Sequence, residues 1–313
     1  MSIKTPIDTP MRLIRQAECR TPTPNPNIRQ ETPIKVWFGK AKRRLGYYEA
    51  RNRISEPKFR RALRHTDTFL LGHPKSGHTW LAYMLALLMA EEKDPNVNLL
   101  NVGNFVPFVH GRDHDIAKYK HLPNPRVFRN ERPVHHKLYP RILYIIRDPR
   151  AVLVSYWHMY RVLLGDEDTS LESFIDQYLK GTGCFTYWNK HIVRWDRQVK
   201  MAFLESEKND RLHVVRYEDL VENRRIVLEG ITHFLDLSPH ADRLSLAVEH
   251  GSFRAMRAVE DQFGAEAYKG RAKGTGSFVR QGKVDGWVHE LDGEISTRIC
   301  NEFGSIMAEA GYD

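Results

Sequence analysis

The sequence of 313 residues predicts an α/β fold: a P-loop-like parallel β-sheet flanked by helices on both faces. Three observations lead to this fold class. Short apolar runs have the length of buried strands, a helical segment follows each run, and glycine- or proline-containing turns separate the two. Such alternation is typical of parallel sheets, because a connection between parallel strands must cross over the sheet. We therefore expect the ligand site at the carboxyl ends of the strands.

The first strand is expected at Thr68–Leu71, an apolar run of four residues. The next segment, Gly72–Gly77, has the composition of a turn. A helix is expected at Thr79–Glu92, and it is apolar on nearly every side, which predicts that it is buried.

The same rhythm returns twice further along the chain. Arg141–Ile146 is a continuous apolar strand, and Pro149 stands near the first turn of the helix expected at 150–164. A third strand is expected at Leu212–Arg216, and a helix around 223–235 follows it. The turns after the three strands should converge at one edge of the sheet.

The composition is that of a globular protein, with 41% hydrophobic and 28% charged residues. The longest apolar run, Trp80–Ala90, is far shorter than the roughly 20 residues that span a bilayer. The N-terminus also lacks the apolar core of a secretory signal. The cysteines Cys19, Cys184 and Cys300 are too few and too far apart for a disulfide framework or a Cys-based zinc site. These features favour a cytoplasmic protein.

The positive charge is concentrated at the N-terminus. Residues 1–66 hold 16 Lys and Arg against 5 Asp and Glu, whereas the whole chain has a net charge of +9. We expect 1–33, which is rich in proline, to be a disordered or extended arm, 34–66 a basic helical extension, and 67–313 the main domain. The arm could contact an anionic surface, although a solvated tail is the favoured interpretation, and no nucleic-acid partner is expected.

The turn after the first strand predicts an anion site. Its pattern Gly72-x-x-x-x-Gly77-His78-Thr79 is the skeleton of a phosphate-binding loop, with His78 where lysine usually stands. Glycines allow successive N–H groups to face an anion, and the helix N-terminus adds about half a positive charge. Lys75 supplies a cation from within the loop.

Five segments resemble the sulfotransferases that use 3′-phosphoadenosine 5′-phosphosulfate (PAPS). His73–Trp80 is similar to their 5′-phosphosulfate loop, which usually reads Pro-Lys-Ser-Gly-Thr-Thr-Trp. The other segments follow in the family's order, and they are Tyr144–Tyr156, Arg216–Leu220, Val248–Met256 and Phe278–Trp287. With the strand that precedes the first of them, they span 68–287, so the resemblance covers most of the expected main domain.

The resemblance implies the roles of the loop residues. Lys75 would neutralise the leaving phosphate oxygen, Ser76 would modulate Lys75, and the next three residues would bind the 5′-phosphate: Gly77, His78 and Thr79. Such a site needs no metal, because the loop and the arginines supply the positive charge. The metal-like spacing of His110 and His114 fits a polar loop better than a metal site.

The resemblance also implies the rest of the donor site. Arg147 and Ser155 would bind the 3′-phosphate, completed by Arg280, Gln281 and Gly282. Gln281 stands where the family commonly has lysine. The adenine would lie between Trp80 and Phe253, near Tyr217. Ser252 and Met256 would also contribute to donor binding.

The catalytic base departs from the family pattern. Glu131 aligns with the position where the family commonly has histidine, and Arg129 aligns with the family's lysine. A buried carboxylate can accept the acceptor's proton. His135, His136 and His78 are alternative bases, and an ion pair of Glu131 with Arg129 or Arg132 is the alternative role for the carboxylate.

The predicted function is transfer of the sulfuryl group from PAPS to a hydroxyl or amine of a small-molecule or glycan acceptor. We expect the acceptor pocket along Phe105–Val109, the 156–164 helix and 183–188, whose aromatic residues suit an apolar or ring-shaped body. The alternatives are a P-loop nucleotide kinase and a non-catalytic protein that binds polyanions. The acceptor and the oligomeric state are not evident from the sequence.

Overall fold

The computed structural model describes residues 55–90, 96–109, 112–131, 133, 135–181, 193–206, 210–267, 276–277 and 279–312. The predicted arm, 1–33, lies outside these residues, as does most of the predicted extension. Residues 55–62 are helical, and Phe59 is fully buried in the same hydrophobic cluster as Phe69. This end of the 34–66 segment therefore packs into the core of the main domain.

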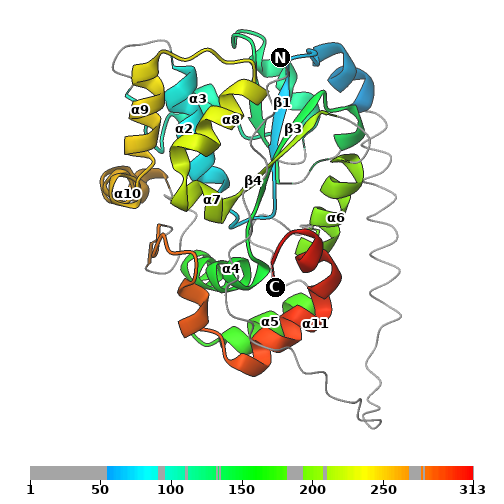
Figure 1. The fold of residues 1–313 in the computed structure, drawn as a ribbon, viewed down its shortest axis with the longest axis vertical. Helices are drawn as coiled ribbons and strands as arrows, with labels where there is room; N and C mark the ends of the chain where they lie inside the picture. Colours follow the sequence, from blue (N-terminus) through cyan, green and yellow to red (C-terminus); the bar gives the residue numbers. More distant parts are fainter. Residues whose placement is uncertain are drawn as a thin grey trace, which may run out of the picture.

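Four parallel strands form one sheet with the order β2-β1-β3-β4 (Figure 1). Three of them were expected and are confirmed: β1 (Thr68–Leu71), β3 (Arg141–Ile146) and β4 (Leu212–Arg216). The fourth, β2 (Val127–Arg129), was not predicted, since three residues are too few for a periodic pattern. β1 is therefore interior, hydrogen-bonded to β2 and β3.

Ten helices follow residue 77 in the described part of the chain, and 3-10 turns lie between some of them. The helices are α2 (His78–Met89), α3 (Val102–Phe105), α4 (Pro149–Leu164), α5 (Leu171–Leu179), α6 (Trp195–Ser206), α7 (Tyr217–Glu222), α8 (Arg224–Phe234), α9 (Ala241–His250), α10 (Phe253–Ala267) and α11 (Gly293–Glu309). The 3-10 turns are Asp113–Tyr119, His136–Leu138 and Gly286–His289.

The helices that follow the strands begin close to where the sequence places them. α2 starts at His78 and is buried on almost every side, as its apolar composition predicts, but it ends at Met89 rather than Glu92. α4 begins at Pro149, and the Asp148 carboxylate caps it by accepting a hydrogen bond of 2.8 Å from the Arg150 N–H. Because each of these helices follows its strand after a short turn, both helix N-termini lie at the carboxyl edge of the sheet.

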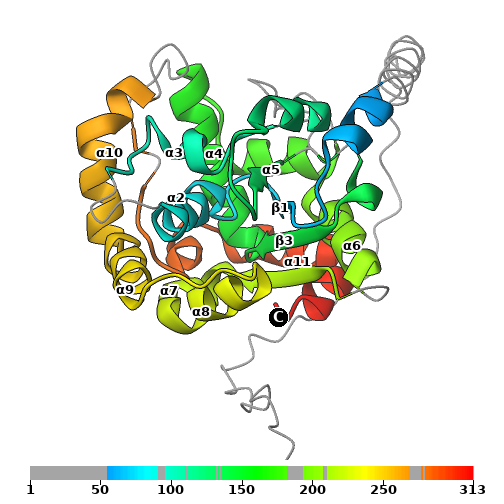
Figure 2. The ribbon, with the colours of Figure 1, turned by 90° about the horizontal axis from the view of Figure 1, so that it is seen from above.

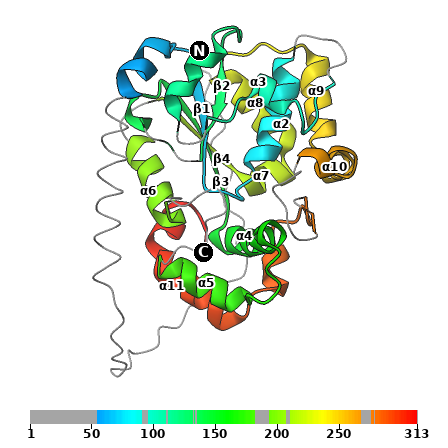
Figure 3. The same ribbon diagram turned by 180° about the vertical axis from the view of Figure 1, so that it is seen from behind.

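The sheet has a hydrophobic core on each face, since alternate strand residues point to opposite sides. Phe69 and Tyr144 pack with residues of α4, α5, α6 and α11, whereas Leu70, Leu143 and Ile145 pack with α2, α8 and α9. Figures 1 and 3 show α2, α8 and α9 on one side of the strands and α6 on the other. The flanking of both faces by helices is thereby confirmed.

Helices α4, α5 and α11 gather at one end of the sheet, where β3 leads into α4 (Figure 1). In the view from above, α9 and α10 form the outer rim beside α2 (Figure 2). None of the helices in the described residues is long and apolar enough to cross a membrane.

Candidate active site

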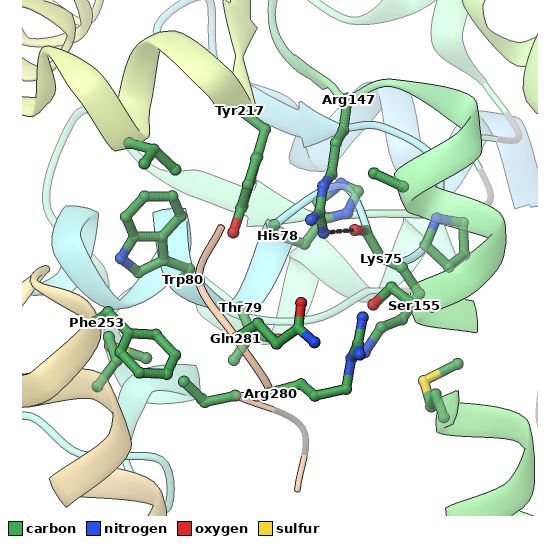
Figure 4. A pocket seen from close by; sticks show the side chains of 18 of the residues that line it. Lys75, His78, Thr79, Trp80, Arg147, Ser155, Tyr217, Phe253, Arg280 and Gln281 are labelled. Atoms are coloured by element: carbon green, nitrogen blue, oxygen red, sulfur yellow. Dashed lines mark hydrogen bonds between the residues drawn. The ribbon is translucent and has the colours of Figure 1, made fainter. Parts of the chain in front are cut away.

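A cavity of about 660 Å³ opens at the carboxyl ends of β1, β3 and β4 (Figure 4). Lys75 follows β1, Arg147 follows β3 and Tyr217 follows β4, and all three line the cavity. α2, α4, α8, α10, the end of β2 and the segment 279–287 contribute further residues to its walls. The cavity thus lies at the edge of the sheet where the ligand site was expected.

The loop after β1 has a backbone that only particular residues tolerate. Gly77 precedes α2 with φ of +107°, and a Cβ there would lie 2.9 Å from the ring of Tyr217. Lys75 also has a positive φ, +73°, which is unusual for a residue with a side chain. The Ser76 N–H closes the turn by donating to the His73 carbonyl oxygen over 3.1 Å. The loop is therefore a tight turn that leads into a helix N-terminus, which suits an anion.

Positive charge dominates the cavity wall. A single carboxylate, Glu131, lines it among the described residues, against six cationic side chains: Lys75, Arg129, Arg147, Arg224, Arg280 and Lys283. Charges of one sign in a recessed site raise the local concentration of the opposite charge. The expected ligand is therefore a polyanion.

Lys75 is the cation most affected by its surroundings. Burial, and to a smaller extent the neighbouring Arg147, lower its pKa to about 8, while the Glu131 carboxylate acts in the opposite direction. The protonated form of Lys75 is therefore costly in the protein by itself, and an anionic ligand would offset that cost.

Arg147 connects the cavity wall to the loop. Its Nη1 donates to the carbonyl oxygen of Lys75 over 3.3 Å, and the contact is drawn in Figure 4. The guanidinium also lies over the ring of Tyr217, 4.0 Å from the ring centroid. Ser155, one of the residues expected to accompany Arg147, lines the cavity from α4. Both members of the expected pair therefore line the cavity.

Aromatic residues line the other end of the cavity. The Trp80 indole donates to the Gly251 carbonyl oxygen over 2.7 Å and meets Tyr217 edge to face. Gly282, with φ of +62°, lies so close to Phe253 that a Cβ would be 2.2 Å from the ring. The phenyl ring is 41% exposed, so its face is available to a planar ligand. Met256 completes this wall.

Arg280 approaches the cavity from the segment after α10, and its guanidinium is held by a carboxylate. Its Nη1 lies 2.5 Å from Oε1 of Glu290, whose Oε2 lies 2.5 Å from Nε2 of His158. Burial alone would raise the pKa of Glu290, but hydrogen bonds from His158 and Arg280 lower it below its ordinary value. Gln281 also lines the cavity.

The structure brings two of the four candidate bases together. Glu131 follows β2 and lines the cavity, and its Oε1 lies 3.8 Å from Nδ1 of the buried His78. His135 does not line the cavity: its Nε2 lies 3.1 Å from the Ser55 hydroxyl and its ring stacks on Phe59. His136 opens a 3-10 turn and does not line the cavity either.

The alternative role for Glu131 was an ion pair with Arg129 or Arg132, and the structure describes only the first of these arginines. Arg132 lies outside the described residues. The Arg129 side chain donates from Nε to the Val106 carbonyl oxygen over 3.1 Å, and its guanidinium lies over the Phe108 ring. Arg129 therefore faces the same wall as Phe108, one of the residues expected to contact an acceptor.

Two of the expected donor-site residues do not line the cavity. Ser76 is fully buried within the loop and is not among the residues that line the cavity. The Ser252 hydroxyl accepts from the Ala255 N–H over 3.2 Å and so caps α10. Conversely, Arg224 lines the cavity from α8, 5.5 Å over the Trp80 ring, and was not foreseen. No sequence signal marks it, because an arginine on an amphipathic helix has the pattern of a surface residue.

The expected polar loop around His114 has a structural role. Asp113 is buried and accepts hydrogen bonds from the Asn130 amide, the Tyr139 hydroxyl and the His135 N–H at 2.6–2.7 Å. Within the described residues, no group of three or more His, Cys, Asp and Glu side chains is placed to hold a metal. His110 lies outside them.

Known proteins resemble this chain over most of its length. The family model of the sulfotransferase domain matches residues 65–311. The 3-beta-hydroxysteroid sulfotransferase of Cavia porcellus is 24% identical over 257 residues, which cover 79% of this chain and 84% of the relative. The amine sulfotransferase of Oryctolagus cuniculus is 26% identical over 262 residues, 79% of this chain and 82% of the relative.

Solved structures share the fold. A mouse sulfotransferase complexed with PAP aligns with a TM-score of 0.54 at 22% identity, covering 79% of this chain and 86% of that one. A retinol dehydratase in a complex with retinol and PAP aligns with a TM-score of 0.59 at 16% identity, covering 80% and 86%. Since the family model spans most of the residues and the strands and helices follow the same architecture, the chain belongs to the sulfotransferase family.

Proposed function

We propose that the protein transfers the sulfuryl group of PAPS to a hydroxyl or amine of an acceptor and releases 3′-phosphoadenosine 5′-phosphate (PAP). The composition of the cavity carries the proposal: six cations and one carboxylate, Glu131, line it among the described residues. Two of the cations, Lys75 and Arg147, are joined by a hydrogen bond. Relatives of this chain are sulfotransferases, and two structures with the same fold hold PAP.

The described residues suit each part of the donor. The loop from Lys75 to Thr79 would hold the 5′-phosphosulfate at the N-terminus of α2. Arg147, Ser155 and Arg280 would bind the 3′-phosphate. Trp80 and Phe253 would enclose the adenine, and Gly282 leaves space beside the Phe253 ring that a Cβ would fill.

The chemistry requires one cation and one base. The acceptor oxygen forms a bond to sulfur while the bond between sulfur and the bridging phosphate oxygen breaks, and its electron pair stays on the phosphate. Lys75 would neutralise that developing charge, and Glu131 would take the proton of the acceptor hydroxyl. We assign the base to Glu131 ahead of His135 and His136, which do not line the cavity. His78, which lines the cavity 3.8 Å from Glu131, is the second candidate. Ser76 would modulate Lys75 from within the loop.

The acceptor is proposed to be a small molecule with an apolar body. Leu99, Phe108, Val154 and Met159 give the cavity an apolar lining, and Phe108 is 45% exposed. Relatives are named for hydroxysteroids and amines, and one protein with the same fold was crystallised with retinol. A glycan acceptor is the second candidate within this proposal. The third expected segment of the pocket, 183–188, lies outside the described residues.

Two related proposals concern the surroundings of the enzyme. The cytoplasm is the proposed compartment, on the basis of the cysteine content. The basic residues of the N-terminal arm would contact an anionic surface in an accessory role. Since Phe59 is part of the core, a deletion that tests the arm should remove only residues 1–54.

Binding and transfer assays test the function directly. We expect PAP to bind without magnesium, and labelled sulfate to move from PAPS to a member of a panel of steroids, phenols, amines and sugars. A nucleotide kinase would instead bind Mg-ATP in preference to PAP. A non-catalytic polyanion-binding protein would lose its ligand when residues 1–54 are deleted, whereas the proposed enzyme would keep PAP binding.

A further inference from the structure

A chain of hydrogen bonds runs behind the donor loop, away from the cavity. Nδ1 of the buried His73 lies 2.9 Å from the Pro74 carbonyl oxygen, and its Nε2 lies 3.0 Å from the Tyr178 hydroxyl of α5. That hydroxyl also accepts the Trp195 N–H over 2.7 Å, and the Trp195 indole donates to the Arg147 carbonyl oxygen over 3.2 Å. His73, Tyr178 and Trp195 do not line the cavity.

The direction of each hydrogen bond follows from the chemistry of the groups. The Pro74 carbonyl can only accept, so Nδ1 of His73 carries the proton. Burial lowers the pKa of His73 to about 4, so the ring is neutral at pH 7 and its Nε2 is an acceptor. Tyr178 therefore donates to Nε2 and uses its oxygen to accept from Trp195. With these directions, each of the four contacts pairs a donor with an acceptor, so one tautomer of His73 satisfies them all.

These contacts hold two consecutive peptide groups of the loop. His73 fixes the Pro74 carbonyl, and Arg147 fixes the Lys75 carbonyl. Since a trans peptide sets its N–H opposite to its C=O, the orientation of the next two N–H groups is fixed as well. Lys75 lies between them with φ of +73°, a conformation that costs roughly 1–2 kcal/mol in a residue with a side chain. The loop holds this conformation only while its neighbours impose it.

We propose that His73 and Tyr178 are positioning residues that hold the donor loop in its binding conformation and couple it, through Trp195, to Arg147. This inference rests on the proposed function, because it treats Lys75 and Arg147 as donor ligands. Neither residue touches the donor. Their effect is that the loop is already ordered when the donor arrives, so that no binding free energy is used to order it.

The size of the effect follows from the strained residue. Without the Tyr178 hydroxyl, the loop can relax to conformations in which Lys75 leaves the left-handed region. Donor binding must then restore the strained conformation, so the apparent affinity is the intrinsic affinity multiplied by the fraction of molecules that still hold the binding conformation. The strain at Lys75 corresponds to a loss of about fivefold to thirtyfold in affinity.

The test measures PAP affinity by calorimetry in folded protein, together with the KM values for PAPS and the acceptor. Tyr178→Phe removes one hydroxyl and keeps the ring. His73→Asn keeps a donor close to the position of Nδ1 but cannot reach Tyr178. We expect both variants to bind PAP at least fivefold more weakly and to raise the KM for PAPS, while the KM for the acceptor stays within twofold.

Tyr139→Phe is the matched control, because Tyr139 is a buried tyrosine whose hydroxyl donates to Asp113, away from the donor loop. We expect Tyr139→Phe and Tyr178→Phe to lower the melting temperature by similar amounts. Of these two variants, only Tyr178→Phe should bind PAP more weakly. If Tyr178→Phe and His73→Asn are destabilised but bind PAP like the wild type, the two residues are structural and the inference is wrong. If the wild-type protein does not bind PAP, the proposed function itself fails.

Discussion

Nδ1 of His78 lies 3.8 Å from Oε1 of Glu131, and these are two positions at which the chain departs from the usual sulfotransferase motifs. The family commonly has threonine where His78 stands and histidine where Glu131 stands. Both side chains line the cavity, one from the donor loop and the other after β2. An imidazole and a carboxylate thus both lie beside the donor loop, the imidazole where the family commonly has threonine and the carboxylate where it commonly has histidine.

Glu131→Gln should lower kcat by about 100-fold to 10,000-fold, because the amide cannot take the proton of the acceptor. PAP affinity should stay close to that of the wild type, since Glu131 is the sole carboxylate among the described residues of a cationic cavity and is not expected to bind an anion. Single-turnover sulfate transfer from labelled PAPS measures the first quantity and calorimetry with PAP the second.

His135→Gln and His136→Asn are the control variants for the base, and both should retain turnover. The proposed assignment is wrong if turnover survives in Glu131→Gln and disappears in either histidine variant.

Lys75→Met should abolish transfer and, at pH 7, stabilise the donor-free protein by up to about 3 kcal/mol. The gain follows from the pKa of Lys75, which burial lowers from 10.5 to about 8, so the protonated side chain opposes folding below pH 8. The stabilisation should decline as the pH rises from 8 to 10.5. Urea unfolding without donor at pH 7 and pH 10 measures it, and an equal effect at both values would contradict the role of burial.

PAP affinity should fall as the pH rises above 8. Lys75 loses its proton in the free protein at about this pH, whereas the phosphates of PAP favour the protonated form in the complex. Binding then requires proton uptake, so affinity should decline by up to about tenfold per pH unit. Below pH 8 this residue contributes no further change. Calorimetry in buffers of different ionisation enthalpy detects the proton, and Lys75→Met should lack the decline.

Gly282→Ala should weaken PAP binding by about tenfold or more. The new Cβ would lie 2.2 Å from the Phe253 ring, and the backbone φ of +62° would be strained by about 1–2 kcal/mol. The ring must move from the proposed adenine site. Gly304→Ala is the control, because nothing lies within 4 Å of its Cβ in helix α11, and it should bind PAP normally. Fluorescence or calorimetric titration of both variants with PAP would show whether the ring matters.

The strands and the loop could be predicted because their signals are local. Arg141–Ile146 is a continuous apolar run, and its bounds in the structure agree with the prediction. The strand at Val127–Arg129 could not be found, because three residues between Arg126 and Asn130 give no period. It is defined by its pairing with β1 instead. Long-range hydrogen bonding therefore decided what local sequence could not.

From sequence alone, the donor loop and its cation could be placed, since glycine positions and a following helix impose the backbone that an anion needs. Tertiary structure decided what meets that loop. In the folded chain Glu131 lies beside His78, whereas His135 and His136 lie outside the cavity. Arg224 also lines the cavity, although its helix has the sequence pattern of a surface helix. The physical reason is that side chains distant in sequence become neighbours only when the sheet register and helix packing are complete.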